Sequence, residues 1–398
     1  MRDTIIFAGG YGLPDRTASG IRVLGMATLF RRLGYQVLVL GKFEQAPTMD
    51  AAEHEKIIDD IPCRDIRQPL PGQVFRSYVV SAHPVIAAVD EIGALRVRAV
   101  LAYNYPARGA FALIRACQSR GIAPVLECAD WYGWEGRKIL RNLWRLTGVA
   151  VRMHILTRLA GNIICASSWL QNKLPGQHTL LLPWVIDITH PRWARAELEV
   201  PSIDRPVRFV YSGSPGVGLY KDRLPLMIEA LTVLAREGHL FDCTIAGLTE
   251  AQYLAVVPQH RDCLREIGDQ VRFLGRISHT ESITLVRNAD FSVFFRETNR
   301  MSSTGFPTKF VEATTLGVPV ISNATSDIPR YLRDGVNGIM ATGVSKRAVS
   351  EALRRAVNMS AAERGAMQVA CRTDNPFGIC HWAEPTKCFL DDLRGMHD

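Results

Sequence analysis

The regular alternation of strand-like and helix-like segments constrains the fold of this chain more than any other feature. Apolar strand-like runs at 4–8 and 36–40 flank a helical segment at 19–33, and Gly34 stands at the position that commonly ends a helix. Further strand-like runs follow at 97–102, 123–128, 162–166 and 179–182. Strands that are joined by helices in this order form parallel sheets with helices on both faces, so the sequence predicts an α/β fold.

The length of the chain predicts two domains. With 398 residues the chain exceeds what one hydrophobic core ordinarily organises. A second alternating series begins near Val207, and its helical segment at 222–237 carries apolar residues at helical spacing. Strand-like runs of this series lie at 243–247, 271–275, 291–295 and 318–322. The proline-containing segment 191–208 reads as a linker, so we expect one domain over residues 1–190 and a second over 191–374.

Composition and cysteine usage exclude several classes of protein. No apolar run approaches the ~20 residues that a membrane-spanning helix needs. The nine cysteines are scattered without a CxxC pair, which favours reduced thiols over a disulfide framework or a zinc site. The chain begins on a strand-like run without the pattern of a signal peptide, so we expect a cytoplasmic protein.

The net charge of +8 is concentrated in one segment of the first domain. Between Gly136 and Ile186 there is no Asp or Glu, whereas Lys and Arg recur and several tryptophans lie in or beside the segment. The residues concerned are Arg137, Lys138, Arg141, Arg145, Arg152, Arg158 and Lys173, with Trp131, Trp134, Trp144, Trp169 and Trp184. This pattern favours contact with an anionic membrane surface, at the cytoplasmic face. A solvated helix face with core tryptophans is the alternative, and no motif supports nucleic-acid binding.

The segment 305–322 predicts a loop, a short helix and a buried strand that together suit a nucleotide-sugar. The N-terminus of a helix near Pro307 presents free backbone N–H groups to an anion. Glu312 lies about a turn and a half further on, where its carboxylate reaches a sugar hydroxyl. Gly317 ends the helix, and the apolar run after it resembles a parallel strand. The segment therefore combines a phosphate site with a carboxylate for hydroxyls.

A glycine-rich loop in the same domain predicts a second part of this anion site. Gly213 and Gly216 follow one strand, and Lys221 precedes the next helix, which places the loop at the carboxyl edge of a parallel sheet. Glycines let the backbone approach a ligand, and Lys221 can neutralise a diphosphate. The loop is not a P-loop, because the Gly-Lys-Ser/Thr ending is missing. A plain glycine turn is the alternative.

Two segments of the first domain are candidates for contact with sugar. The glycines at 9–12 follow the first strand and form either a ligand-facing loop, a dinucleotide site or an inert turn, although the GxGxxG spacing is absent. The segment 127–135 places carboxylates beside aromatic rings, which suits sugar hydroxyls and C–H faces respectively. Residues 103–105 end the preceding strand and could join it. The alternative is that Asp130 caps a helix and the aromatic residues are core.

The motif GFPTKFVEATTLGVPVIS at 305–322 resembles the donor-binding signature of group-1 (GT4-type) glycosyltransferases of the GT-B fold. Other segments match in order, namely 209–213 with Lys221 and Asp222, 271–278, 181–187 and 9–41. The resemblance implies two Rossmann-like parallel-sheet domains that face each other across a cleft. The first would bind the acceptor and the second, over 191–374, the donor. A C-terminal helix within 375–398 would pack back on the first domain.

The resemblance also implies roles for individual residues. The expected catalytic residues are Lys221, which matches the family's lysine, and Asp130 and Arg296, which are candidates for the places of the family's cleft histidine and arginine, for which this chain has no match. The expected donor-binding residues are Gly10, Gly12, Ser212, Gly213, Gly216, Gly247, Arg276, Ile277, Phe306, Pro307, Thr308, Lys309, Phe310 and Glu312. The expected acceptor-binding residues are Tyr103, Asn104, Glu127, Asp130 and Trp131. We expect no metal or other cofactor, because an Asp-x-Asp donor motif is missing.

The implied reaction moves a sugar from a nucleoside-diphosphate sugar, with UDP as the expected nucleotide, to a hydroxyl of a lipid-linked or polysaccharide acceptor. Retention of the anomeric configuration is implied as well. The chain departs from the family pattern at Thr304, where the first glutamate of an E-x7-E pair is usual, and at Gly216 and Val217, where an arginine is usual. A nucleotide-sugar epimerase of the same fold and an inactive binding protein therefore stay as alternatives.

Overall fold

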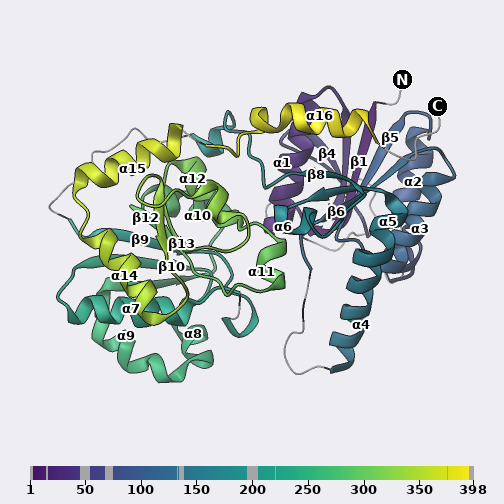
Figure 1. The fold of residues 1–398 in the computed structure, drawn as a ribbon. Helices are drawn as coiled ribbons and strands as arrows, with labels where there is room; N and C mark the ends of the chain where they lie inside the picture. The colour runs from purple at the N-terminus through teal and green to yellow at the C-terminus, as the bar shows by residue number, and fades with distance from the viewer. Residues whose placement is uncertain are drawn as a thin grey trace. The chain divides into compact units, whose positions relative to one another are not determined.

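The computed structural model describes residues 3–14, 17–44, 54–67, 75–131, 133, 139–194, 205–219, 221–373 and 375–393. The chain divides into two units (Figure 1). The first unit comprises Met1–Asp187, Thr304–Phe306 and Ile379–Asp398, and the second comprises Ile188–Ser303 and Pro307–Gly378. Each unit holds one sheet flanked by helices, which confirms the predicted α/β fold class.

The first unit is built on an eight-stranded sheet. Its elements are β1 (Thr4–Gly12), α1 (Ala18–Arg32), β2 (Gln36–Lys42), β3 (Glu55–Ile58), β4 (Ile61–Asp65), a π-helical turn (Phe75–Val80), α2 (His83–Ile92), β5 (Val97–Tyr103), α3 (Ala107–Gln118), β6 (Ala123–Cys128), α4 (Ile139–Val151), a second π-helical turn (Arg152–Leu156), α5 (Thr157–Ala160), β7 (Asn162–Cys165), α6 (Ser168–Gln171), β8 (His178–Leu181), a 3-10 turn (Ile379–Trp382) and α16 (Ala383–Asp391). The strand order is β3-β4-β2-β1-β5-β6-β7-β8. Every pair is parallel except β3 with β4.

The sequence of β1 explains why helices cover both faces of this sheet. Ile5 and Phe7 enter one apolar core, while Ile6 and Ala8 enter the other, because successive side chains of a strand point to opposite faces. The first core is closed by α1 and by Phe389 of α16, and the second by α2 and α3 (Figure 1). The C-terminal helix is therefore part of the first unit.

The second unit is built on a six-stranded sheet whose pairs are all parallel, in the order β11-β10-β9-β12-β13-β14. Its elements are a 3-10 turn (Pro191–Trp193), β9 (Val207–Ser212), a 3-10 turn (Val217–Leu219), α7 (Leu224–Arg236), β10 (Phe241–Ala246), α8 (Glu250–Val256), a 3-10 turn (Pro258–His260), α9 (Arg261–Ile267), a 3-10 turn (Gly268–Gln270), β11 (Val271–Gly275), α10 (His279–Arg287), β12 (Phe291–Val293), α11 (Arg300–Thr304), α12 (Thr308–Leu316), β13 (Val320–Asn323), α13 (Ile328–Tyr331), β14 (Gly338–Ala341), α14 (Lys346–Val357) and α15 (Ala361–Thr373).

Two local predictions differ from the structure. The glycines at 9–12 were expected in a loop, but β1 continues through them to Gly12, which pairs with Lys42 after an irregularity in register. The sequence also predicts one long helix over about 137–159 with a break near Gly148. Within the described residues the change comes later, at Arg152, where a π-helical turn follows α4. Within the described residues, no helix combines the length and apolar character needed to cross a bilayer.

Candidate functional site

The glycine loop after β9 lies directly beside Lys221 and Lys309 of the second unit. Gly213 has a φ of +132°, and a Cβ placed on it would lie 3.3 Å from Nζ of Lys309. Gly247 follows β10 with a φ of +123°, and a Cβ there would lie 2.1 Å from the carbonyl oxygen of Gly213. Both positions therefore require glycine for conformation and for space. The loop can in this way bring its backbone close to a ligand at the carboxyl edge of the sheet.

A buried carboxylate organises the cations around this loop. Asp222, which is 1% exposed, accepts from Nε of Arg296 at 2.7 Å through Oδ1. Its Oδ2 accepts from Nζ of Lys309 at 2.6 Å and from the hydroxyl of Tyr211 at 2.8 Å. We call Tyr211, Asp222, Arg296 and Lys309 the Asp222 cluster. The structure thus brings together Arg296 and Lys309, two of the predicted site residues, around a carboxylate that matched the family pattern but was given no role from the sequence.

The Asp222 cluster carries more positive than negative charge. Burial alone would raise the pKa of Asp222, but the attraction of Lys309 and Arg296 outweighs it and holds that pKa well below its usual range. The pKa of Lys309 is lowered to about 8, mainly by burial. Asp222 acts in the opposite direction, but the positive charges of Arg296 and Lys221 lower this pKa further. Lys221 itself is exposed at the end of the loop. An anion that approached the cluster would relieve this excess of positive charge.

The predicted short helix is confirmed as α12. It begins after Pro307, which provides no side-chain cap, and it ends at Gly317 in the left-handed conformation with a φ of 78°. The first turn therefore presents backbone N–H groups without a capping side chain, on the element that also carries Lys309. Ser212 ends β9, and the predicted residues Thr308 and Phe310 lie on α12 itself.

Glu312 is held by a histidine that the sequence reasoning missed. Nε2 of His279 and Oε1 of Glu312 lie 2.8 Å apart, and the two side chains are 10% and 11% exposed. His279 is the first residue of α10, whose start is fixed by a reciprocal capping box between Ser278 and Glu281. The predicted donor-binding residues Arg276 and Ile277 directly precede this cap. The side chain of His279 therefore connects the start of α10, just after Arg276 and Ile277, to the carboxylate of Glu312 on α12.

The predicted acceptor residues gather at the carboxyl ends of β5 and β6 in the first unit. Nδ2 of Asn104 donates to Oδ2 of Asp130 at 2.8 Å, and the ring of Tyr103 packs edge-on against Tyr11 at 5.7 Å. The ring of Trp131 lies edge-on to Trp169, with 6.0 Å between centroids. Asp130 and the aromatic rings are therefore placed near one sheet edge.

Glu127 differs from these residues because it is fully buried. Its Oε1 accepts from Nε of Arg22 at 2.7 Å, and Arg22 also donates to the carbonyl oxygen of Leu182. Burial raises the pKa of Glu127, and the charge of Arg22 offsets this in part. The geometry gives this carboxylate an internal partner, which is the behaviour of a structural ion pair.

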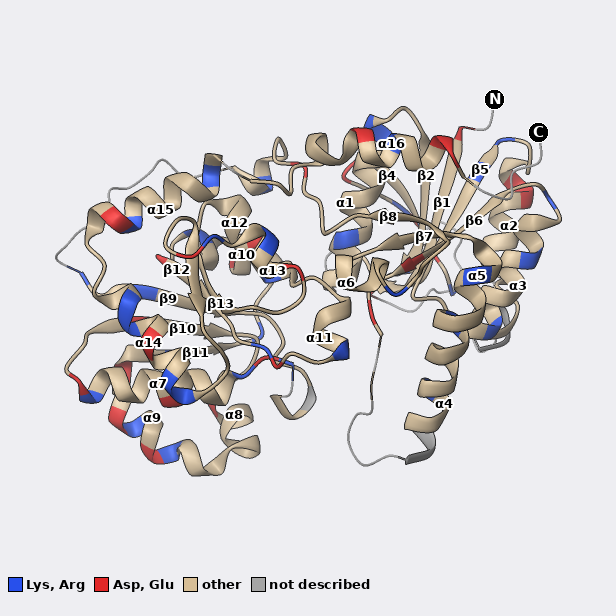
Figure 2. Cartoon of the chain, viewed as in Figure 1, with Lys and Arg blue, Asp and Glu red and all other residues tan. Residues whose placement is uncertain are grey.

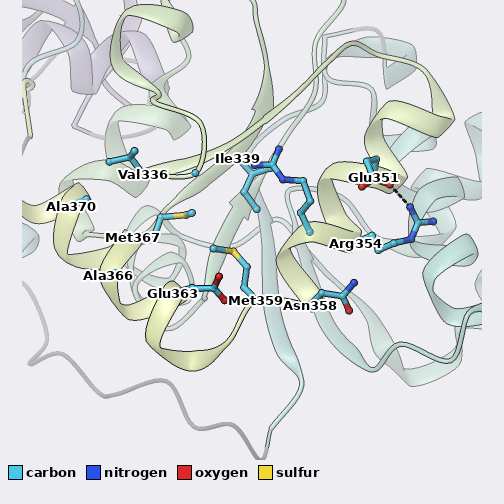
Figure 3. A pocket seen from close by; sticks show the side chains of 12 residues that line it. Val336, Ile339, Glu351, Arg354, Asn358, Met359, Glu363, Ala366, Met367 and Ala370 are labelled. Atoms are coloured by element: carbon cyan, nitrogen blue, oxygen red, sulfur yellow. Dashed lines mark hydrogen bonds and ion pairs between the residues drawn. The ribbon is translucent and has the colours of Figure 1, made fainter.

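The other predicted donor residues do not all lie in one unit. Gly10 and Gly12 lie at the end of β1, and Phe306 groups with the first unit, whereas Pro307 groups with the second. One cavity of about 700 Å³ lies elsewhere, between α14, α15 and β14 (Figure 3). It is lined by Gly335, Val336, Ile339, Glu351, Arg354, Arg355, Asn358, Met359, Glu363, Ala366, Met367 and Ala370, none of which is a predicted site residue. In the described ranges, no cluster of His, Cys, Asp and Glu could hold a metal ion.

The basic segment of the first unit is partly structural. Arg152 is buried and donates to the carbonyl oxygen of Asp130, Arg145 donates to that of Gly133, and Trp184 is 1% exposed. Arg137, Lys138 and Trp134 lie outside the described residues. Trp144 on α4 is 66% exposed, and Figure 2 shows no acidic residue along the described part of that helix. The exposed surface of α4 therefore includes large apolar side chains, and two of the cations beside it, Arg145 and Arg152, are engaged internally.

Comparison with known proteins gives a family match over part of the chain and a shared fold. Residues 209–370 match the family model described as glycosyl transferases group 1. The crystal structure of Anabaena Alr3699/HepE in complex with UDP and glucose matches with a TM-score of 0.67 at 15% identity, over 99% of this chain and 100% of that one. Sucrose-phosphate synthase from Thermosynechococcus elongatus matches with a TM-score of 0.66 at 14% identity, over 98% and 99% of the two chains.

A third structure extends the comparison. WaaG, a glycosyltransferase involved in lipopolysaccharide biosynthesis, matches with a TM-score of 0.62 at 15% identity, over 98% of this chain and 100% of that one. At sequence identities this low, these structural matches show that the fold is shared. Among curated protein sequences, none matches this chain significantly.

Proposed function

Residues 209–370 match the group 1 glycosyltransferases and the chain has the GT-B fold. From this premise we propose that the chain is a glycosyltransferase of this family that transfers a sugar from a UDP-sugar to a hydroxyl of a lipid-linked or polysaccharide acceptor, with retention. The observation that carries the donor part is the Asp222 cluster beside the glycine loop and the uncapped start of α12. A diphosphate is the anion that suits several cations and a helix N-terminus together. The complex of Alr3699/HepE with UDP supports uridine as the nucleoside.

In this reaction the bond between the anomeric carbon and the diphosphate oxygen breaks, and a bond to the acceptor oxygen forms. The proton of the acceptor hydroxyl passes to the departing diphosphate. Negative charge grows on that diphosphate, and Lys221, Lys309 and Arg296 are the groups that would stabilise it. Because these cations neutralise the leaving group themselves, we propose a reaction without a metal ion. Asp130, oriented by Asn104, is the proposed catalytic group of the first unit.

Replacing Glu312 with glutamine is expected to weaken nucleotide binding about tenfold or more. A hydrogen bond between a ribose hydroxyl and a carboxylate contributes roughly 1.5–3 kcal/mol, and 1.4 kcal/mol is a factor of ten. The measurement is calorimetric titration with UDP after a thermal-shift screen of UDP-, GDP-, ADP- and dTDP-sugars. Glu250→Gln, an exposed carboxylate of α8, is the matched control. Equal affinities of Glu312→Gln and wild type would remove Glu312 from the donor site.

The proposed acceptor side rests on an exposed apolar face of the first unit. Leu143 and Trp144 of α4, Val151 at its end and Ile155 in the π-helical turn are all exposed large apolar residues. We call these four residues the α4 face. They recur at nearly helical spacing, and the sequence around them lacks acidic residues from 136 to 186. Such a face suits the interfacial zone of a membrane with anionic lipid, where a lipid-linked acceptor would be found.

The double variant Leu143→Ser, Trp144→Ser is expected to lower membrane partitioning about a hundredfold or more, because each apolar side chain withdrawn from the interface loses roughly 1.5–3 kcal/mol and 1.4 kcal/mol is a factor of ten. The measurement is flotation with vesicles of phosphatidylcholine, with and without phosphatidylglycerol. Leu95→Ser, an exposed leucine outside α4, is the control. Wild-type protein that ignores both kinds of vesicle would contradict the membrane proposal and leave the donor site unaffected.

A further inference from the structure

Two cations of the first unit lack a carboxylate partner. Lys42 ends β2 and is half-buried, and its Nζ lies 5.4 Å from the centroid of the Tyr78 ring. Arg152 is 6% exposed and donates to the carbonyl oxygen of Asp130 at 2.8 Å, while its Nε is buried without a hydrogen-bond partner. In the part of the chain that the structure describes, neither cation forms an ion pair with a carboxylate. Buried cations of this kind call for an anion.

The carboxylates that act on these two cations are already paired with other arginines. Asp65 accepts from Nη2 of Arg67 at 2.6 Å, and Glu127 accepts from Nε of Arg22 at 2.7 Å. Burial lowers the pKa of Lys42 and the charge of Arg67 lowers it further, whereas Asp65 compensates only in part. An excess of positive charge therefore remains around the two cations.

The side chain of Tyr78 links the two cations. A Cβ placed on Gly10 would lie 2.8 Å from the hydroxyl oxygen of Tyr78 and 3.4 Å from Nζ of Lys42, so glycine leaves room for both groups. Burial raises the pKa of Tyr78 and the charge of Arg152 acts in the opposite direction, which places this guanidinium near the same phenol. The ring of Tyr105 lies edge-on to Tyr78 at 4.7 Å, and its hydroxyl is buried without a partner among the described residues. The groups gathered here are hydrogen-bond donors.

These groups lie where the order of the strands reverses. Strand β1 stands between β2, which follows it directly in the chain, and β5, which pairs with its other side. Gly10 lies near the end of β1, Lys42 ends β2, and Tyr105 follows β5. In open α/β sheets, ligands bind outside the carboxyl ends of the strands at such a reversal. The position is therefore one at which the fold itself favours a ligand.

We propose that Lys42, Arg152 and Tyr78 bind a phosphoryl group that the acceptor carries. A guanidinium and an ammonium together balance the two negative charges of a phosphate, and a phenol hydroxyl adds a donor, whereas a single carboxylate would leave one positive charge unmatched. The inference rests on the proposed function, which takes the first unit as the acceptor side. Arg152 also holds the backbone of Asp130, the proposed catalytic group, so the phosphoryl group would lie close to the reacting hydroxyl. It belongs either to a phosphorylated sugar or to the phosphate of a lipid carrier.

The test uses protein saturated with UDP, so that the donor site does not take up the probes. Calorimetry at constant ionic strength measures the affinity of inorganic phosphate, of glucose 6-phosphate and of dihexanoyl phosphatidic acid below its micelle concentration. The variants are Lys42→Met and Tyr78→Phe, which remove the ammonium or the hydroxyl and keep most of the side chain. Arg152 stays unchanged, because it also supports the backbone of Asp130. Lys387→Met, an exposed lysine of α16, is the control.

We expect the UDP-loaded wild type to bind at least one of the three phosphates, and each variant to weaken that binding about tenfold with the affinity for UDP unchanged. Tightest binding of phosphatidic acid would identify a lipid carrier, and tightest binding of glucose 6-phosphate a phosphorylated sugar. Wild-type protein that binds UDP but none of the phosphates would overturn this inference alone. Phosphate binding that both variants leave unchanged, or that Lys387→Met weakens equally, would overturn it as well. Wild-type protein that binds no nucleotide would overturn the proposed function and this inference with it.

Discussion

Asp222→Ala is expected to destabilise the second unit by about 3–5 kcal/mol, the usual result of leaving buried charges without their partner. Lys309 and Arg296, which are 8% and 6% exposed, would then lose the negative charge with which both are paired. The hydroxyl of Tyr211 would lose its acceptor as well. The measurement is hydrogen exchange of the backbone amides in α12 and β12, which reports the stability of this unit separately from the first.

The control for this variant is Asp262→Ala. The Asp262 side chain is 89% exposed and pairs with the exposed Arg265 three residues later. Exposed pairs of this kind contribute little, so the expected change is below about 0.5 kcal/mol. Similar protection of α12 amides in Asp222→Ala and wild type would show that the cations relax toward solvent, and would contradict the cluster as a structural centre.

The pH dependence of stability offers a second measurement on Asp222. Lys309 and Arg296 hold its folded-state pKa below the unfolded value of about 3.9, despite burial, which acts in the opposite direction. Its contribution is therefore complete above the unfolded pKa and is lost as the pH falls below that value. Asp222→Asn lacks this group, so its stability should fall less steeply with acidification below about pH 4 than that of the wild type.

The elements that the sequence predicts well are those with local signals. Pro307 before α12 and Gly317 after it mark the two ends of that helix within a dozen residues, and the structure has both. The alternating apolar runs of β1, β2 and β5 predict a parallel sheet because each run is buried on both faces. Strand β3 was missed because it has only four residues and the first three, Glu55, Lys56 and Ile57, are exposed, which leaves no buried apolar run.

The parts of the site that escaped prediction depend on pairs far apart in sequence. Asp222 lies 74 residues from Arg296 and 87 from Lys309, and no periodicity links these positions. His279 looks like an ordinary first residue of a capped helix until the fold brings Glu312 to it. The sequence also could not separate Glu127 from its neighbour Asp130. Only the fold brings Arg22, 105 residues earlier, to the buried carboxylate.

Lys221→Ala is expected to lower the rate of sugar release from the donor about 10²- to 10³-fold, the usual effect of removing one preorganised group that stabilises charge in the transition state. Lys309 and Arg296 already share Asp222, so part of their charge is compensated before a ligand arrives. Lys221 is exposed, and its backbone N–H donates to the carbonyl oxygen of Pro215 at 2.9 Å, which fixes its start beside the glycine loop. It therefore stands beside the loop where we expect the departing diphosphate, and its charge adds to that of Lys309 and Arg296.

The kinetic pattern distinguishes this role from simple binding. The assay follows UDP release from the UDP-sugar that stabilises the protein most, with water as the acceptor, so that it needs no identified acceptor. If Lys221 acts on charge that develops during bond breaking, kcat and kcat/KM fall together while the affinity for UDP changes by a smaller factor. Lys346→Ala, an exposed lysine of α14, should behave as wild type. A Lys221→Ala variant with unchanged kcat and a raised KM would show that Lys221 binds donor and transition state equally. Lys309 and Arg296 would then be the residues that stabilise the departing diphosphate in the transition state.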